Sequence, residues 1–499
     1  MIKPEDKKIF FTAFLGMINL IFLSYLGYNY PWLESLGFLI IIILFIILTF
    51  RYLLLGFYLV LAELFLGSFG RLLSIDFFGY QLSLRIALFI IFFVIFSLWY
   101  LEKRVNLNLK DFVFKKIFIL FLLAIFWTTL NGFFQNNHGI FIFYDMNAFL
   151  FLFYAFIFLA VLNKREIIKN IVIILGAAIS VTLIINLNLF LLFAYQPPLD
   201  LVAIYKWFRD VRLGEVTLIF NNIYRIFSQA QIFSLIGFFV FFTIYSSKYF
   251  FKNNLLNDKK DYRVFFVFSL IANLSIIISF SRSFWLGFIG ALILLLILLI
   301  DKYKLSFTTV SKIMVNLIFI TLLNLAFLYL ISGSFSPALI RGRFNNLLNE
   351  PASTSRLQQL GPLWQNIKNN LILGTGFGKT VTYNSTDPRI LNEFPDGHYS
   401  TYAFEWGYLD LLLKFGIIGF IIYLALLWKI LKRGGDLISN NLGHLDEILI
   451  IGLLGGFGAL LITNIFSPYL NHPLGLGYLL LLMVIFNYYA NEQKTIARH

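Results

Sequence analysis

The apolar residues of this chain fall into long, continuous blocks that short polar connections separate. Residues 36–50 and 284–300, for example, offer nothing polar to cover a water-facing side. A helix needs roughly 20 predominantly apolar residues to cross the hydrocarbon core of a bilayer. Continuous blocks favour transmembrane helices over a β-barrel, in which apolar and polar residues alternate. The pattern therefore predicts an all-α fold, a polytopic integral membrane helix bundle.

The number of blocks predicts about 14 transmembrane helices, within a range of 12–14. The whole chain is 60% hydrophobic and 13% charged, whereas about a quarter of a soluble domain is charged. It contains no cysteine, which excludes disulfides, thiol catalysis and cysteine-ligated metal sites. The blocks lie near residues 9–27, 32–50, 52–69, 86–101, 115–133, 148–163, 168–195, 227–247, 264–280, 284–300, 310–332, 408–428, 447–465 and 475–490.

Basic residues mark alternate connections between the blocks. With a cytoplasmic N-terminus, the inside segments hold 25 basic residues, while the outside connections 27–31, 131–147 and 467–473 hold none. Cytoplasmic loops of membrane proteins carry an excess of lysine and arginine. We therefore expect a multi-pass protein of the cytoplasmic (inner) membrane with both termini in the cytoplasm.

One outside connection is far longer than the others. Residues 331–407 form a polar insert between predicted spans 11 and 12, although a handful of residues is enough to join two helices. We interpret the insert as an external, periplasmic catalytic loop between a helix bundle (1–330) and three further spans with a cytoplasmic tail (408–499). Its glycine-rich run, residues 374–378, is expected to form a tight turn, because no strand precedes it as in a phosphate-binding loop.

Arginine dominates the basic residues of the predicted outer side. Ten of the 13 outside basic residues are arginine, compared with six of the 25 inside. A guanidinium group matches the geometry of phosphate and carboxylate, whereas lysine suits a solvated topology signal. We therefore expect the outer face to bind an anionic group. Arg71 and Arg85 are exceptions, which we expect to anchor spans at lipid headgroups.

Three outer arginines are predicted to bind an anionic group. Arg282 lies between two spans in a turn with two serines, whose hydroxyls offer further donors. Arg225 opens the eighth span from the same side. Arg356 begins a predicted helix of the insert, where a structural salt bridge is an equal alternative. The secondary candidates are Ser281, Ser283, Arg341 and Arg343.

Two residues compete for the role of catalytic base. His398 is the first choice, because it lies where the insert returns to the membrane and imidazole accepts protons near neutral pH. Glu405, at the start of span 12, is the alternative. Asp410 and Lys414 are four residues apart and are expected to pair on one helix face. No histidine pair has metal-ligand spacing, so no metal site is expected.

The order of these features resembles the O-antigen ligase and O-antigen polymerase superfamily of bacterial membrane glycosyltransferases. The resemblance covers roughly residues 220–430. It rests on the 281–283 turn, the long external loop, the stretch from Arg356 through Trp364 to the glycine-rich run, and the stretch from His398 to residues 408–419. Tyr399 stands where the family pattern commonly has asparagine, which keeps Glu405 open as the base.

The resemblance implies an enzyme that transfers or polymerises a glycan carried on undecaprenyl (polyprenyl) diphosphate onto an acceptor hydroxyl, at the outer face of the membrane. Such a donor is already activated, so neither cofactor nor metal is expected. The resemblance implies that Arg225, Arg282 and Arg356 bind its diphosphate. The implied partners are this donor, a glycan or lipid-core acceptor and membrane lipids, with no nucleic acid. The products would be lipopolysaccharide or exopolysaccharide of the cell envelope. Polymerisation, ligation and transfer to protein stay open, and a transporter (flippase) of lipid-linked oligosaccharide is the alternative.

Overall fold

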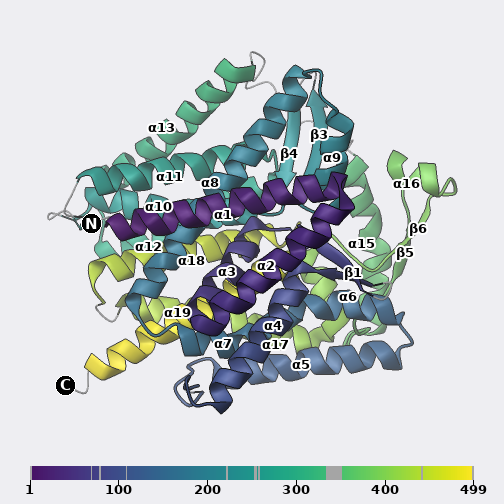
Figure 1. Ribbon diagram of the computed structural model, residues 1–499, viewed down its shortest axis with the longest axis horizontal. Helices are drawn as coiled ribbons and strands as arrows, with labels where there is room; N and C mark the ends of the chain where they lie inside the picture. The colour runs from purple at the N-terminus through teal and green to yellow at the C-terminus, as the bar shows by residue number, and fades with distance from the viewer. Residues whose placement is uncertain are drawn as a thin grey trace.

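The computed structural model describes residues 3–68, 70–77, 80–107, 109–220, 223–251, 255–256, 259–332, 351–439 and 442–496. The fold is a bundle of long helices that run between two ends of the molecule (Figure 1). They are α1 (Pro4–Asn29), α2 (Pro31–Arg51), α3 (Leu53–Leu66), α4 (Leu84–Leu101), α5 (Lys115–Phe134), α6 (Gly139–Leu150), α7 (Tyr154–Val161), α8 (Arg165–Tyr195), α10 (Gln231–Ser246), α11 (Lys259–Ile278), α12 (Arg282–Tyr303), α13 (Phe307–Ser332), α17 (Gly407–Ser439), α18 (His444–Thr463) and α19 (Pro473–Ile496).

The helices coincide with the apolar blocks of the sequence, so the prediction of a membrane helix bundle is confirmed. Among the described residues, 13 helices are long and apolar enough to cross a membrane, with α6 and α7 counted as one. The remaining block holds α3, which has 14 residues. At 1.5 Å per residue α3 is about 21 Å long, shorter than the roughly 30 Å hydrocarbon core. The count of 14 spans therefore stays a prediction.

The expectation of an all-α fold is wrong in one respect, because three two-stranded antiparallel hairpins join the helices. They are β1–β2 (Ser74–Phe77 and Tyr80–Ser83), β3–β4 (Gly214–Phe220 and Ile223–Ser228) and β5–β6 (Val381–Asn384 and His398–Thr401). All three lie in connections predicted to be outside. Polar connections of this length satisfy their backbone groups by pairing with themselves, which a search for long apolar blocks does not detect.

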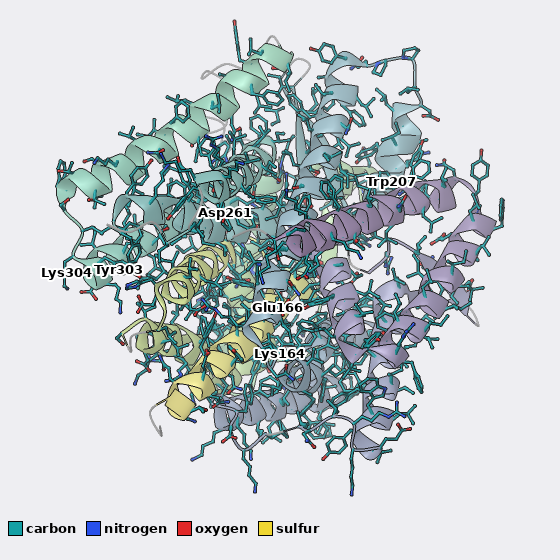
Figure 2. All side chains as sticks on the ribbon, turned by 60° about the vertical axis from the view of Figure 1, so that its left-hand side comes forward. Lys164, Glu166, Trp207, Asp261, Tyr303 and Lys304 are labelled. Carbon is teal, nitrogen blue, oxygen red and sulfur yellow. The ribbon has the colours of Figure 1, made fainter. Side chains whose placement is uncertain are left out.

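The connecting structure is concentrated at one end of the bundle. The hairpins, the short helices α9 (Leu201–Asp210) and α16 (Pro388–Glu393), and α15 (Pro351–Asn369) lie on the right in Figure 1, opposite both termini. Figure 2 likewise separates Trp207 of α9 from Tyr303 and Lys304 at the end of α12. The predicted outer connections therefore meet at one end, which we call the loop end.

A reporter fusion tests which side of the membrane the loop end faces. We expect a reporter fused after Tyr399 to read external and one fused after Gly443 to read cytoplasmic, because α17 lies between them and carries Lys429, Lys432 and Arg433 in its second half. Two reporters give opposite signals: alkaline phosphatase is active only outside the cytoplasm, and a fluorescent protein fluoresces only inside it. Identical readings at both positions would mean that α17 does not cross the membrane.

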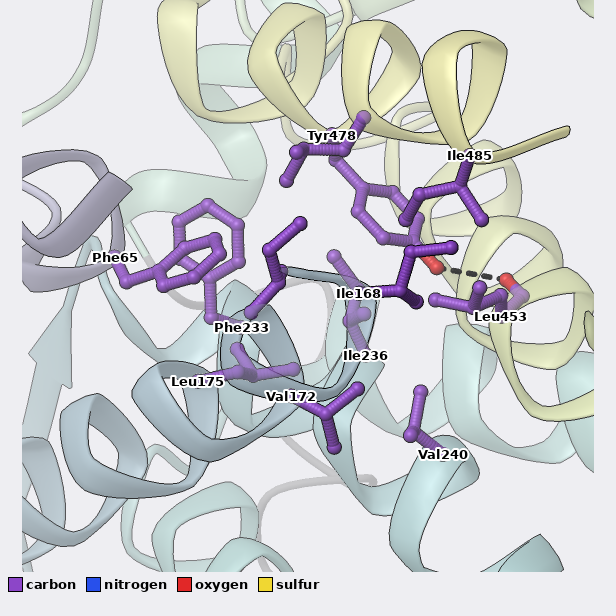
Figure 3. A pocket seen from close by; sticks show the side chains of 12 residues that line it. Phe65, Ile168, Val172, Leu175, Phe233, Ile236, Val240, Leu453, Tyr478 and Ile485 are labelled. Atoms are coloured by element: carbon purple, nitrogen blue, oxygen red, sulfur yellow. Dashed lines mark hydrogen bonds between the residues drawn. The ribbon is translucent and has the colours of Figure 1, made fainter. Parts of the chain in front are cut away.

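The core of the bundle is built around α10, all of whose residues are buried. Glycines on α18 allow close helix packing here: a Cβ added at Gly452 would lie 2.8 Å from Val240 Cα. A closed apolar cavity of about 20 Å³ lies between α3, α8, α10, α18 and α19, where the Tyr478 hydroxyl donates to Leu453 O at 2.7 Å (Figure 3). This cavity holds about one water molecule, so it is not a substrate site.

Arg85 is not a headgroup anchor, contrary to the expectation from sequence. It is 8% exposed and donates to both carboxylate oxygens of Glu63 at 2.8–3.1 Å and to Ser68 O at 2.6 Å. The two charges lie on α3 and α4, and their pairing offsets part of the cost of burying them. The expectation for Arg71 stays a prediction.

Candidate functional site

The turn between α11 and α12 positions Arg282 as the first residue of α12. Its two neighbouring serines are buried, and their hydroxyls are 2.9 Å apart. The Ser283 hydroxyl also lies 3.0 Å from the hydroxyl of Ser467, in the connection between α18 and α19. The secondary candidates Ser281 and Ser283 therefore hold the turn against that connection, and Arg282 is half-buried beside them.

Arg225 lies against the same turn, although 57 residues separate it from Arg282. It is on β4, and its Nε donates to Ser279 O at 3.0 Å. Its guanidinium lies 4.8 Å from the ring centroid of Phe227, in cation–π geometry. The β3–β4 hairpin and the α11–α12 turn thus bring together two of the three arginines that the sequence singled out.

Arg356, the third arginine, forms an ion pair with Glu405. The pair joins α15 to the segment that leads into α17, and Trp406 Nε1 donates to Arg356 O at 2.9 Å. The Trp406 ring in turn lies 5.5 Å from that of Phe466, the residue before Ser467. The Arg356–Glu405 pair and the Arg282 turn therefore flank the same end of α18, at the loop end of the bundle.

His398 belongs to the β5–β6 hairpin, which packs against α15: the Tyr383 hydroxyl on β5 lies 3.0 Å from that of Ser355. His398 opens β6, where its backbone pairs with Asn384, and its side chain is exposed. Asp396 Oδ1 accepts from the backbone N–H of His398 at 3.1 Å, so that bond does not orient the ring. Among the residues that the structure describes, no hydrogen bond or ion pair links the His398 ring to the three arginines or to Glu405.

His472, in the connection between α18 and α19, has a structural role. Its Nδ1 accepts from Leu474 N at 3.3 Å at the start of α19, which confirms that it caps a turn. Burial, with a contribution from the positive charge of Arg85, lowers the pKa of His472 to about 3. His472 therefore does not titrate near neutral pH.

The glycine-rich run forms the tight turn that the sequence predicts. Gly374, Gly376 and Gly378 all have positive φ, between 73° and 77°. A Cβ added at Gly376 would lie 2.1 Å from the backbone nitrogen of Gly132 on α5, so no larger residue fits there. The run is wedged between α5, α6 and α17 and fixes one end of the insert to the bundle.

Residues in and beside the same run form hydrogen bonds with the backbone of α17 where that helix is broken. The helix is interrupted at Gly416, which has φ 64° and ψ −178°. At the break, the carbonyl of Leu413 accepts from Thr375 N at 2.8 Å, and Ile417 N donates to Leu371 O at 2.7 Å. A broken membrane helix is stable only where neighbouring groups satisfy its backbone in this way.

A buried charge cluster adjoins the break. Lys414 Nζ lies 2.7 Å from Asp410 Oδ1, which confirms the predicted pair, and 2.8 Å from Asp145 Oδ1 on α6. Asp145 Oδ2 also accepts from Gly378 N at 2.7 Å. No sequence signal pointed to Asp145, because it lies 269 residues from Lys414. The cluster locks α6, α17 and the glycine-rich run together.

Comparison with known families agrees with this arrangement. Residues 264–424 match the family model described as O-antigen ligase. The chain carries an O-antigen ligase domain. The match confirms the resemblance that the sequence suggested, and it lies within the predicted span of residues 220–430. No curated protein and no solved structure matches the chain.

The O-antigen ligase domain contains most, but not all, of the candidate residues. Arg282, Arg356, His398 and Glu405 lie within it, while Arg225 reaches the site from β4, ahead of the matched region. The domain also includes the glycine-rich run and the break in α17. The secondary candidates Arg341 and Arg343 lie within the match but outside the described residues.

Proposed function

We propose that this protein is a membrane glycosyltransferase that transfers or polymerises a glycan from polyprenyl diphosphate onto an acceptor hydroxyl, at the outer face of the cytoplasmic membrane. The observation that carries the proposal is the meeting of Arg225, Arg282 and the Arg356–Glu405 pair around the outer end of α18. Their placement in and beside an O-antigen ligase domain supports this reaction class.

In the proposed reaction the acceptor hydroxyl oxygen attacks the anomeric carbon of the donor. The new glycosidic C–O bond forms as the bond from that carbon to the diphosphate breaks, and the lipid diphosphate leaves with both bonding electrons. Arg225 and Arg282 neutralise the charge that develops on the diphosphate, as preorganised cations do in other transfer reactions. With guanidinium groups in this role, the proposal assigns no step to a metal or a cofactor.

Glu405 is the base in this proposal, in place of His398. Its carboxylate lies beside a proposed diphosphate ligand, whereas His398 is exposed on β6. A diphosphate that binds Arg356 competes with Glu405 for the same guanidinium. Donor binding would therefore release the carboxylate next to the reacting bond, where it accepts the proton of the acceptor hydroxyl.

Transfer by the purified protein tests the proposal. The protein in detergent micelles is mixed with a polyprenyl-diphosphate glycan and a glycan or lipid-core acceptor, and the products are separated by mass. We expect a glycosylated acceptor and one released lipid diphosphate per transfer, with a rate that a metal chelator leaves unchanged. Movement of the donor across a liposome without any transfer would instead assign the chain to the transporters.

A further inference from the structure

A groove of about 480 Å³ opens between α5 and α17 at the end of the bundle opposite the loop end. Its lining is Lys116, Ile117 and Leu120 on α5, and Ala425, Trp428, Lys429 and Lys432 on α17. The groove lies beyond the break at Gly416, near the first turn of α5 and the last turns of α17. The lysine pattern predicts that this end faces the cytoplasm.

The polar part of the groove is purely cationic. Three of its seven lining residues are lysines, and none of the three forms an ion pair with any described residue. Lysines elsewhere on the same side do find acidic partners: Lys169 lies 2.6 Å from Asp6, and Lys302 lies 3.1 Å from Glu447. Three neighbouring cations without an acidic partner fit an anionic ligand.

The other part of the groove is apolar and continues along the helices. Trp428 is 66% exposed and Leu120 is 44% exposed. Toward the middle of the bundle the same faces present Ile421 and Leu424 on α17 and Leu123 on α5, all exposed. An exposed tryptophan between lysines and an aliphatic strip is typical of the level at which lipid headgroups meet acyl chains.

We propose that this groove binds an anionic phospholipid, with its phosphate on the three lysines and its acyl chains along the aliphatic strip. Charge complementarity and the continuous apolar face favour a lipid, because a free anion would use only the lysines. Basic pockets between helices on the cytoplasmic side bind phospholipid headgroups in this way. The lipid would clamp α5 to α17, the two helices that grip the glycine-rich run at their other ends. This inference does not depend on the proposed transfer reaction.

The test compares two triple variants of the full-length protein in detergent micelles. The groove variant is Lys116→Gln/Lys429→Gln/Lys432→Gln. The control, Lys7→Gln/Lys8→Gln/Lys164→Gln, removes the same charge from exposed lysines on the same side. Phosphatidylglycerol should raise the melting temperature of wild type and control by roughly 2–5 °C, because a ligand of the folded state stabilises it. It should leave the groove variant unchanged, and phosphatidylcholine should shift none of them.

A second readout does not require the triple variant to fold. Phosphatidylglycerol brominated on its acyl chains should quench Trp428, so the quenching difference between wild type and Trp428→Phe reports occupancy. Each single Lys→Gln change should weaken this binding about fivefold, which corresponds to about 1 kcal/mol per basic residue. Equal shifts with phosphatidylcholine, or an equal loss in the control triple, would refute the proposal. A rise in melting temperature with polyprenyl diphosphate but not with phosphatidylglycerol would also refute the proposal, since the groove would then bind the glycan carrier.

Discussion

Replacing Arg282 with lysine is expected to lower the rate of glycan transfer by about 100-fold, the loss typical when one charge-stabilising donor is removed from an active site. Lysine keeps the positive charge but lacks the planar fork that contacts two oxygens of a diphosphate at once. Arg282 begins α12, and Arg225 is already engaged by Ser279 O at the same turn. The measurement is the initial rate with saturating acceptor in detergent micelles.

Arg71→Lys is the matched control for this variant. Arg71 is predicted to lie on the same, outer side of the membrane as Arg282, and both side chains are half-buried. Arg71 precedes β1, however, and lies outside the O-antigen ligase domain. We expect it to retain nearly all activity. If both exchanges are tolerated equally, Arg282 only anchors α12 at the headgroups, and the diphosphate site lies elsewhere.

The helices were predictable because their signal is local. A block of about 20 apolar residues has no stable alternative to a helix in a membrane, and every predicted block contains helical residues. The hairpins were not found, because Gly214–Phe220 and Ile223–Ser228 carry short patterns that compete poorly with such blocks. The tight turn at residues 374–378 was predictable, because closely spaced glycines adopt the positive φ that other residues rarely adopt.

The site was only partly predictable, because its contacts join distant parts of the chain. The sequence singled out Arg225 and Arg282 separately, but only the fold brings β4 to the α11–α12 turn. Arg356 and Glu405 were each given a chemical role, while their pairing across 49 residues has no local signature. Arg85 shows the same limit: its partner Glu63 lies on another helix, so an anchor was the simpler interpretation.

Replacing Glu405 with glutamine is expected to lower kcat by about 10²–10⁴-fold, the usual contribution of a general base. Glutamine has nearly the same shape but cannot accept the proton of the acceptor hydroxyl. The KM for the donor should stay the same or fall, because Arg356 would no longer be held by a carboxylate. Arg356→Ala should instead raise the KM for the donor, since it removes a ligand of the diphosphate. The measurement is steady-state transfer over a range of donor concentrations.

His398→Ala is the control that separates the two candidate bases. The exposed side chain of His398 forms no hydrogen bond or ion pair with the described arginines of the site, so we expect this variant to retain most of its turnover. Glu405→Asp, which keeps a carboxylate one methylene shorter, should recover part of the activity that Glu405→Gln loses. A merely structural ion pair predicts a different outcome: a lower melting temperature for Glu405→Gln with kcat nearly intact. An inactive His398→Ala together with an active Glu405→Gln would return the role of base to His398, whose hairpin packs against α15 at Ser355, the neighbour of Arg356.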